Sequence, residues 1–388
     1  MSRFLFVVPP LVGHFFPTVA VGQELIDRGH HVAWAGHAQT IGPLLPPGAE
    51  FLPVAADFGG DTLTELRRRS LGLRGARAFR FLWADFLIPL AVSMLPGVMV
   101  AVDTFQPDVL IADQQALAGA LVAHQRELRW ATTATTSAEL TDQFVGMPQL
   151  GAWARQCLID FQRDLAVSEP IDLRWSYDLV LAFTTEALVG SLSTFPSHYV
   201  FVGPSIGARP CTVTFPWDWL DPGRQHVLVS LGTISPAIGQ QFFATAVQAV
   251  APLAHRLQMI LVAPPGLVGA APEHVLIREF VPQLDLLPYL HAVVSHAGHN
   301  TVCETLAHGV PLVVAPIRDD QPVIARQVTD TGAGLRVQFG RVGATELRGA
   351  ITRIIDDPSY RAAARRVQTS FTTAGGATTA ADHLEKFL

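Results

Sequence analysis

The chain has 388 residues, a length that suits two α/β domains, each large enough for its own core. Hydrophobic residues make up 49% of it, which excludes a disordered chain, and the formal net charge of −6 argues against a nucleic-acid-binding protein that relies on neutralising phosphates. The three cysteines (Cys157, Cys211 and Cys303) are scattered, without a disulfide framework or a CxxC pair, which is typical of a reducing cytoplasm.

The amino-terminal residues are apolar, but the run at 3–11 is short and is broken by Pro9 and Pro10. We interpret it as a buried first strand and not as a signal peptide. No apolar run reaches the roughly 18 residues that a membrane span needs. We therefore expect a cytoplasmic protein without a membrane span.

In the first half, continuous apolar runs alternate with helical patterns, which predicts a parallel sheet. The expected strands lie at 4–8, 31–35, 51–55, 109–112, 130–135, 179–183 and 199–202. A loop at 13–17, which contains His14, precedes a helix at 18–28 that Pro17 can start. Further helical patterns lie at 61–102, 116–126 and 138–167.

A stretch with four prolines at 203–223 separates this half from a second alternating pattern. There the expected strands lie at 227–231, 259–263, 275–280, 292–294 and 311–316. The expected helices lie at 240–251, from about Asn300, and at 323–330, 345–355, 360–369 and 377–387. The fold class is therefore α/β, with two doubly wound Rossmann-like domains in tandem.

We place the first domain at 1–207, the linker at 208–223 and the second domain at 224–374. The last segment, 375–388, is expected to pack back on the first domain. Ligands of doubly wound folds bind at the carboxyl ends of the strands, so the cleft between the two domains is the expected active site.

Two residues at strand ends of the first half could carry proton transfer. His14 follows the first strand, and the pKa of histidine suits a general base near neutral pH. Asp113 follows another strand, where its carboxylate could hold the imidazole by one nitrogen. The alternatives are a helix-capping or partly exposed histidine and an aspartate that caps the next helix. No serine or cysteine lies in a nucleophile elbow, so the base would act on the substrate itself.

Small and polar residues follow two strands of the second half. Ser230, Gly232 and Thr233 form a strand end where backbone can approach a phosphate or ribose. His296, Gly298, Asn300 and Thr301 cluster at a helix N-terminus, which favours an anion.

Carboxylates and an amide continue this second cluster. Glu304 lies one turn beyond Asn300 and could accept hydrogen bonds from ribose hydroxyls, and Asp320 and Gln321 could bind sugar hydroxyls. The pair Asp319 and Asp320 leaves a metal site as an alternative, although no further carboxylates lie nearby.

Aromatic residues are frequent near the predicted catalytic loop. Core packing is one reading, and an apolar acceptor pocket is the other. The residues that we predict for such a pocket are Phe15, Phe79, Trp83, Phe86 and Phe144.

These motifs together resemble the nucleotide-sugar-dependent glycosyltransferases of the GT-B fold, in the family of plant secondary-product and bacterial macrolide and antibiotic glycosyltransferases. The carboxyl-half signature of that family matches at 280–283, 296–301, Glu304, 309–311 and 320–321. The amino-half dyad matches at His14 and Asp113, and the Ser-Leu-Gly-Thr strand end at 230–233. The resemblance covers nearly the whole chain and implies two Rossmann-like domains that face each other across a cleft, the first for the acceptor and the second for the nucleotide sugar.

The resemblance also implies a role for each matched residue. His14 would be the general base and Asp113 its partner, while Phe280 would stack on the pyrimidine and the Val281 backbone would pair with its edge. His296, Asn300, Thr301, Ser230 and Thr233 would hold the pyrophosphate, with Gly232, Gly298 and Gln283 in the same donor site. Glu304 would bind the ribose, and Asp320 and Gln321 the donor sugar.

The resemblance thus implies an inverting glycosyltransferase that moves a sugar from a UDP- or dTDP-sugar to a hydroxyl of a lipophilic acceptor, such as a polyketide, macrolide or aromatic aglycone. No permanently bound cofactor and no metal are expected, and the chain would be a monomer or a homodimer. The alternatives are a UDP-sugar 2-epimerase and a catalytically silent auxiliary protein of a partner glycosyltransferase.

Overall fold

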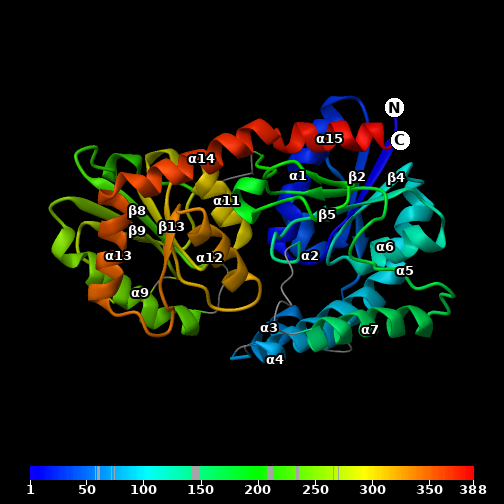
Figure 1. The fold of residues 1–388 in the computed structure, drawn as a ribbon, viewed down its shortest axis with the longest axis horizontal. Helices are drawn as coiled ribbons and strands as arrows, with labels where there is room; N and C mark the ends of the chain where they lie inside the picture. The colour runs from blue at the N-terminus through cyan, green and yellow to red at the C-terminus, as the bar shows by residue number, and fades with distance from the viewer. Residues whose placement is uncertain are drawn as a thin grey trace. The chain divides into compact units, whose positions relative to one another are not determined.

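The chain forms two compact units (Figure 1). The computed structural model describes the chain except residues 57, 59–61, 71, 74, 141–147, 208–212, 233–235, 265 and 270, and except the side chains at 67 and 236–238. Unit 1 consists of Met1–Thr185, Ser191–Pro210 and Ala374–Leu388, and unit 2 consists of Glu186–Gly190 and Cys211–Thr373.

The sheet of unit 1 has seven parallel strands in the order β3-β2-β1-β4-β5-β6-β7. The strands are β1 (Arg3–Val7), β2 (His31–His37), β3 (Glu50–Val54), β4 (Val109–Asp113), β5 (Trp130–Ala134), β6 (Val180–Ala182) and β7 (Tyr199–Phe201). All seven coincide with predicted strands, and the predicted parallel arrangement is confirmed.

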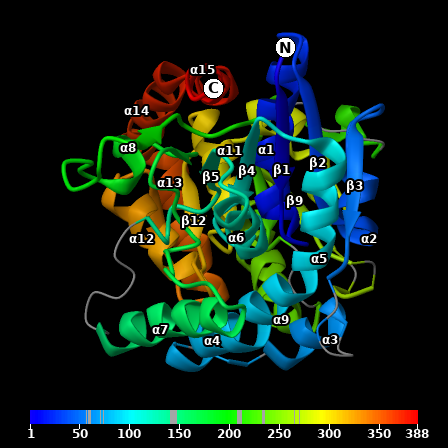
Figure 2. The same ribbon diagram turned by 90° about the vertical axis from the view of Figure 1, so that its right-hand side faces the viewer.

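Helices cover both faces of this sheet, which explains why its strands are continuous apolar runs. Side chains of β1 alternate between the faces, because successive residues of a strand point to opposite sides. Leu5 and Val7 belong to the core that contains α5 (Ile88–Phe105) and α6 (Leu117–Gln125). Phe4 and Phe6 belong to the core that contains α1 (Val12–Asp27) and α15 (Gly376–Lys386). Figure 2 shows the strands of unit 1 together with these helices.

The helices of unit 1 are α1 (Val12–Asp27), α2 (Ala38–Ile41), α3 (Leu63–Ser70), α4 (Ala76–Arg80), α5 (Ile88–Phe105), α6 (Leu117–Gln125), α7 (Pro148–Asp164) and α15 (Gly376–Lys386). Two predictions are corrected. The first helix begins at Val12, so that His14 lies in its first turn and Pro17 inside it, and not in a preceding loop. The helix predicted from residue 138 begins at Pro148, after a turn at 137–140.

A π-helical segment (Phe81–Leu87) joins α4 to α5, and the whole helix Ala76–Phe105 is long and apolar enough to cross a membrane by length and composition. The expectation that no apolar run reaches this length is therefore wrong. The helix nevertheless contributes Leu90, Met94 and Val98 to the core of unit 1, as an apolar helix against a sheet does.

The last helix, α15, packs against α1 within unit 1. Arg28, at the end of α1, forms ion pairs with Asp382 at 2.7 Å and with Glu385 at 2.6 Å. His30 Nε2 lies 2.8 Å from the other oxygen of Glu385. The chain therefore returns to its amino-terminal sheet after completing unit 2.

The sheet of unit 2 has six parallel strands in the order β10-β9-β8-β11-β12-β13. They are β8 (Gln225–Ser230), β9 (Leu257–Val262), β10 (Val275–Arg278), β11 (Ala292–Ser295), β12 (Leu312–Val314) and β13 (Gly334–Arg336). The first five coincide with predicted strands. The short β13 has no counterpart among the predicted strands, because three residues are too few for a pattern.

The helices of unit 2 are α8 (Glu186–Val189), α9 (Pro236–Val250), α10 (Gln283–Leu286), α11 (His299–Ala307), α12 (Gln321–Asp330), α13 (Ala344–Asp356) and α14 (Pro358–Ala374). The short α8 packs against α12, although it lies within the sequence of unit 1. α9 and α13 pack against each other and cover one face of the sheet. Both units thus present the carboxyl ends of parallel strands, where the predicted site residues lie.

Candidate functional site

His14 and Asp113 meet at the carboxyl edge of the sheet of unit 1. The strands β1 and β4 are neighbours, with Val7 opposite Ala112, so the segments that follow them begin side by side. His14 Nδ1 lies 2.9 Å from Asp113 Oδ1. The His14 side chain is 15% exposed, so the ring is held by the protein and still reached from outside. The structure therefore brings together the two residues that sequence reasoning paired.

Asp113 is a hydrogen-bond acceptor inside the protein and not a helix cap. Its carboxyl group is buried, and Oδ1 also accepts from the backbone N–H of Gln115 at 2.9 Å. The next helix, α6, begins at Leu117, and its N-cap is Ala116. The alternative reading of Asp113 as the cap of that helix is thus excluded.

Thr135 completes this cluster and was missed by sequence reasoning. Its hydroxyl donates to Asp113 Oδ2 at 2.5 Å and lies 2.7 Å from His14 Nδ1. The position of Thr135 could have pointed to it. β5 pairs with β4 so that Thr133 lies opposite Asp113, and Thr135 follows at the same edge of the sheet. The signal is weak, because threonine is common in strands and at their ends.

A second carboxyl group lies near the dyad. Gln115 Nε2 donates to Glu139 Oε1 at 2.8 Å. Burial raises the pKa of Glu139, and the hydrogen bond from Gln115 and the charges of Arg174 and His14 oppose that rise in part. Sequence reasoning missed Glu139 because the pattern around it predicts a helix, whereas the structure has a turn there.

The predicted acceptor aromatics separate into two groups. Phe15 is 0% exposed in the core that contains α1 and α15, and Trp83 is 2% exposed in the core that contains α5 and α6, so their assignment to a pocket wall is corrected. Phe79 and Phe86 are half-buried at the surface of that core. Phe144 lies outside the described residues.

In unit 2, the donor-site residues start at the carboxyl ends of β8 and β11. These strands are neighbours, with Ser230 opposite Ser295. The N–H of Gly232, which has a φ of +65°, approaches the hydroxyl of Ser230 at 3.4 Å. Thr233 lies outside the described residues. The predicted small-residue strand end is thus adjacent to the strand that leads into the His296 segment.

The imidazole of His296 lies between two glycines. A Cβ atom added to Gly232 would come within 2.6 Å of the ring, and one added to Gly298 would also come within 2.6 Å of it. Ala297, between His296 and Gly298, has a φ of +68°, a left-handed conformation that costs energy for a residue with a side chain. The local backbone is therefore shaped around this ring.

The Nδ1 atom of His296 is buried and has no hydrogen-bond partner among the described residues. Burial lowers the pKa of His296 to about 4, so the ring is neutral at neutral pH. A buried polar atom without a partner costs free energy, and native proteins rarely keep one unless a ligand, an ion or water completes it. The ring also has a backbone hydrogen bond with Ser230, which partly opposes the lowering of its pKa. Nδ1 is thus the ring atom that has no partner among the described residues.

The helix α11 begins directly after this ring. Its N-cap is Gly298, and Asn300 and Thr301 lie in its first turn, close to the predicted start. The first N–H groups of a helix have no partner within it and carry a partial positive charge. Together with the neutral imidazole they can bind an anionic group such as a phosphate.

The buried Glu304 forms a hydrogen-bonded pair with the half-buried Gln283. Gln283 Nε2 donates to Glu304 Oε2 at 2.6 Å, which connects α10 to α11. Phe280, which precedes α10, is 64% exposed, an unusual position for a large apolar ring. Val281 is half-buried. The structure therefore presents one exposed aromatic face beside a buried, oriented carboxylate.

The loop at 317–321, between β12 and α12, is held by the side chain of Gln321. Gln321 Oε1 accepts from the backbone N–H groups of Ile317 at 2.8 Å and Arg318 at 3.0 Å. Asp319 has a φ of +55°, and its exposed carboxyl group lies 3.3 Å from Arg318 Nε. Asp320 is the N-cap of α12. Within the described part of the chain, no three His, Cys, Asp or Glu residues are grouped as a metal site would require.

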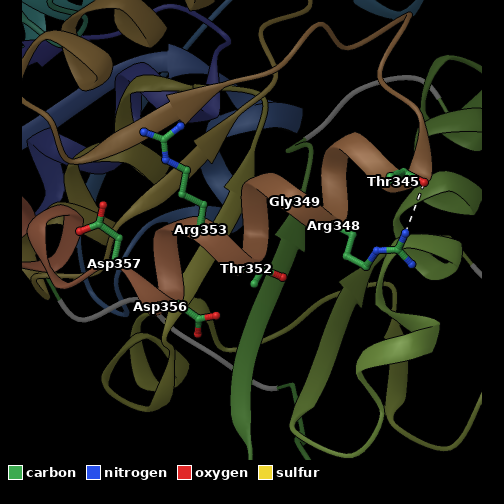
Figure 3. A pocket seen from close by; sticks show the side chains of 7 residues that line it. All are labelled: Thr345, Arg348, Gly349, Thr352, Arg353, Asp356 and Asp357. Carbon is green, nitrogen blue, oxygen red and sulfur yellow. Dashed lines mark hydrogen bonds between the residues drawn. The ribbon is translucent and has the colours of Figure 1, made fainter.

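A surface hollow of about 650 Å³ lies along α13 and contains none of the predicted site residues (Figure 3). It is lined by Thr345, Arg348, Gly349, Thr352, Arg353, Asp356 and Asp357. All of these residues come from one helix and its end, so the hollow lacks the converging elements of a catalytic site.

Comparison with known proteins agrees with this geometry. The family model of the erythromycin biosynthesis protein CIII-like carboxyl-terminal domain matches residues 259–387. The chain is 27% identical to 4'-demethylrebeccamycin synthase of Lentzea aerocolonigenes, with 99% of each chain covered.

Two solved structures have the same fold over nearly the whole chain. The glycotransferase of kitacinnamycin is 25% identical, with a TM-score of 0.78, and the match covers 100% of this chain and 99% of that one. The glycosyltransferase VinC, solved in complex with dTDP, is 21% identical, with a TM-score of 0.78 and 99% of each chain covered.

Proposed function

Since the chain is a GT-B glycosyltransferase of the family that contains the erythromycin CIII-like and macrolide NDP-sugar enzymes, we propose that it transfers a sugar from UDP or dTDP to a hydroxyl of a lipophilic natural product with inversion. The observation that carries this proposal is the contact of His14 Nδ1 with Asp113 at the carboxyl edge of the sheet. A histidine oriented by a buried carboxylate is the arrangement of a general base.

Unit 1 supplies the base in this proposal. His14 Nε2 takes the proton from the acceptor hydroxyl as that oxygen forms a bond to the anomeric carbon. The bond between the anomeric carbon and the phosphate oxygen breaks, and its electron pair leaves with the nucleoside diphosphate. Asp113 stabilises the imidazolium that results, since its carboxylate already lies 2.9 Å from Nδ1.

Unit 2 supplies the donor site. The first turn of α11 and the unpartnered Nδ1 of His296 hold the pyrophosphate, whose charge grows as the bond breaks. The exposed ring of Phe280 stacks on the base, with the Val281 backbone at its edge, and Glu304 binds the ribose. Asp320 and Gln321 bind the sugar, although the Gln321 carbonyl is already engaged by its own loop, so its amide N–H group is the donor.

The acceptor is proposed to be lipophilic because half-buried rings such as Phe79 and Phe86 lie in the helical part of unit 1.

Thermal stabilisation by nucleotides tests the donor site, because a ligand of the folded state raises the unfolding temperature. UDP, dTDP and their sugars are compared, and the best donor is then offered with a panel of hydroxyl-bearing aglycones. Failure of every uridine and thymidine nucleotide to stabilise the protein would contradict the donor proposal. Conversion of the nucleotide sugar without an acceptor would indicate an epimerase.

His14→Ala tests the base. We expect loss of transfer with unchanged stabilisation by the nucleotide. His31→Ala is the matched control, since His31 is an exposed histidine of β2. Full turnover of His14→Ala would show that His14 is not the base.

A further inference from the structure

The side chains of His14, Asp113 and Thr135 form one hydrogen-bonded cluster at the carboxyl edge of the sheet of unit 1. Asp113 Oδ1 faces His14 Nδ1 at 2.9 Å and the backbone N–H of Gln115 at 2.9 Å. Asp113 Oδ2 faces the hydroxyl of Thr135 at 2.5 Å, and the same hydroxyl oxygen lies 2.7 Å from His14 Nδ1. His14 Nδ1 therefore has two oxygen neighbours.

The proton positions follow from what each group can donate. An ionised carboxylate only accepts, and a threonine hydroxyl has one proton to donate. Because Thr135 gives that proton to Asp113 Oδ2, its oxygen can only accept from His14. An unprotonated Nδ1 would then face two oxygen lone pairs at 2.7 Å and 2.9 Å, which is repulsive. The geometry requires a proton on Nδ1.

From this we infer that Thr135 is a positioning residue, whose hydroxyl fixes His14 in the Nδ1–H tautomer and makes Nε2 the basic nitrogen. Without Thr135, Asp113 Oδ2 has no side-chain donor among the described residues, and the carboxylate is held only at Oδ1, by the Gln115 N–H and by His14, so it can turn about that oxygen. Thr135 prevents this by joining the second oxygen to the ring. The importance of the tautomer for catalysis depends on the proposed role of His14 as the base, whereas the tautomer itself does not.

The tautomer can be observed without substrate. The protein is labelled with ¹⁵N-histidine, the signals of His14 are identified by their absence in His14→Gln, and long-range ¹H–¹⁵N spectra of the neutral ring report which nitrogen carries the proton. We expect Nδ1–H in the wild type. An Nε2–H ring in the wild type would overturn the inference.

Two variants isolate the hydroxyl of Thr135. Thr135→Val keeps the shape of the side chain and removes the hydroxyl, and we expect a mixture of the two tautomers. Thr135→Ser keeps the hydroxyl, and we expect the wild-type spectrum. A Thr135→Val ring that stays entirely Nδ1–H would show that Asp113 suffices and would overturn the role of Thr135. If Thr135→Val does not fold, Thr135→Ala takes its place with the same two outcomes.

Kinetics separate positioning from a merely structural role. We expect Thr135→Val to lower kcat by about ten- to a hundredfold, with the KM of the nucleotide sugar unchanged, and Thr135→Ser to restore most of kcat. Equal loss in both variants would contradict the inference. If His14→Ala remained active, the proposed function would fail, while the spectra would still decide the tautomer.

Discussion

The two units each place one histidine at the carboxyl edge of a parallel sheet, and the two rings differ in how their Nδ1 atoms are satisfied. His14 Nδ1 contacts Asp113 and Thr135. His296 Nδ1 is buried without a partner among the described residues, between two glycines that fit closely around the ring. A ring whose Nδ1 is fully engaged by the protein is oriented for proton transfer through its other nitrogen. A ring whose Nδ1 lacks a partner is prepared for a ligand. The same residue type thus suits a base in one unit and a binding group in the other.

The largest expected effect comes from breaking the His14 arrangement. Asp113→Asn keeps the shape of the side chain but puts an amide where the carboxylate accepts, so we expect kcat to fall by on the order of 10³-fold or more. Binding of the nucleotide should be unchanged when it is measured by thermal stabilisation. Asp103→Asn, at an exposed aspartate of α5, is the control. A loss below tenfold would mean that the carboxylate does not orient the base.

The next effect comes from closing the space around His296. Gly232→Ala places a methyl group within 2.6 Å of the ring at a φ of +65°, and we expect a cost of about 2–4 kcal/mol in folding or in nucleotide affinity. Urea unfolding and nucleotide titration measure the two parts. Gly340→Ala is the matched control, because nothing lies within 4 Å of its added Cβ atom. Equal behaviour of the two variants would contradict a closely fitted ring.

The lowered pKa of His296 predicts a pH dependence of stability. The folded pKa of about 4 lies below the ordinary value of 6.5, so the unfolded chain binds more protons between these values. The free energy of unfolding should therefore fall as the pH drops from 6.5 to 4, by up to about 3 kcal/mol from this group. His296→Ala should reduce this slope in unfolding curves taken across the range. An unchanged slope would show that the ring protonates freely in the folded state.

A smaller effect is expected from the exposed aromatic ring of the donor site. Phe280→Ala should weaken the binding of UDP or dTDP by about 1–3 kcal/mol, the usual worth of stacking on a base. Because Phe280 is 64% exposed, its removal should leave the unfolding temperature of the free protein nearly unchanged. Phe280→Trp should retain the affinity. Unchanged affinity in Phe280→Ala would place the base elsewhere.

The order of elements along the chain is predictable because a strand that is buried on both faces consists of a continuous run of apolar residues. Twelve of the strands found in the structure coincide with such runs, and Asp113 and His296 stand out as polar residues at or just after the ends of β4 and β11. His14 lies in the helix that follows β1. The residues at 280–321 carry most of the resemblance to nucleotide-sugar-dependent glycosyltransferases, and that resemblance implies the nucleotide sugar. The amino-acid sequence therefore determines the fold class and the strand ends where chemistry is expected.

The hydrogen-bond partners of these residues depend on the tertiary structure. Thr135 reaches the dyad because β5 pairs with β4, a neighbour that residue patterns within one strand do not report. Glu139 contacts Gln115, the second residue after Asp113. Folding also decided that Phe15 and Trp83 are core residues and that His14 lies in the first turn of a helix. The physical reason is that periodicity records how each residue is buried, whereas a hydrogen bond depends on which other segment lies within about 3 Å of it.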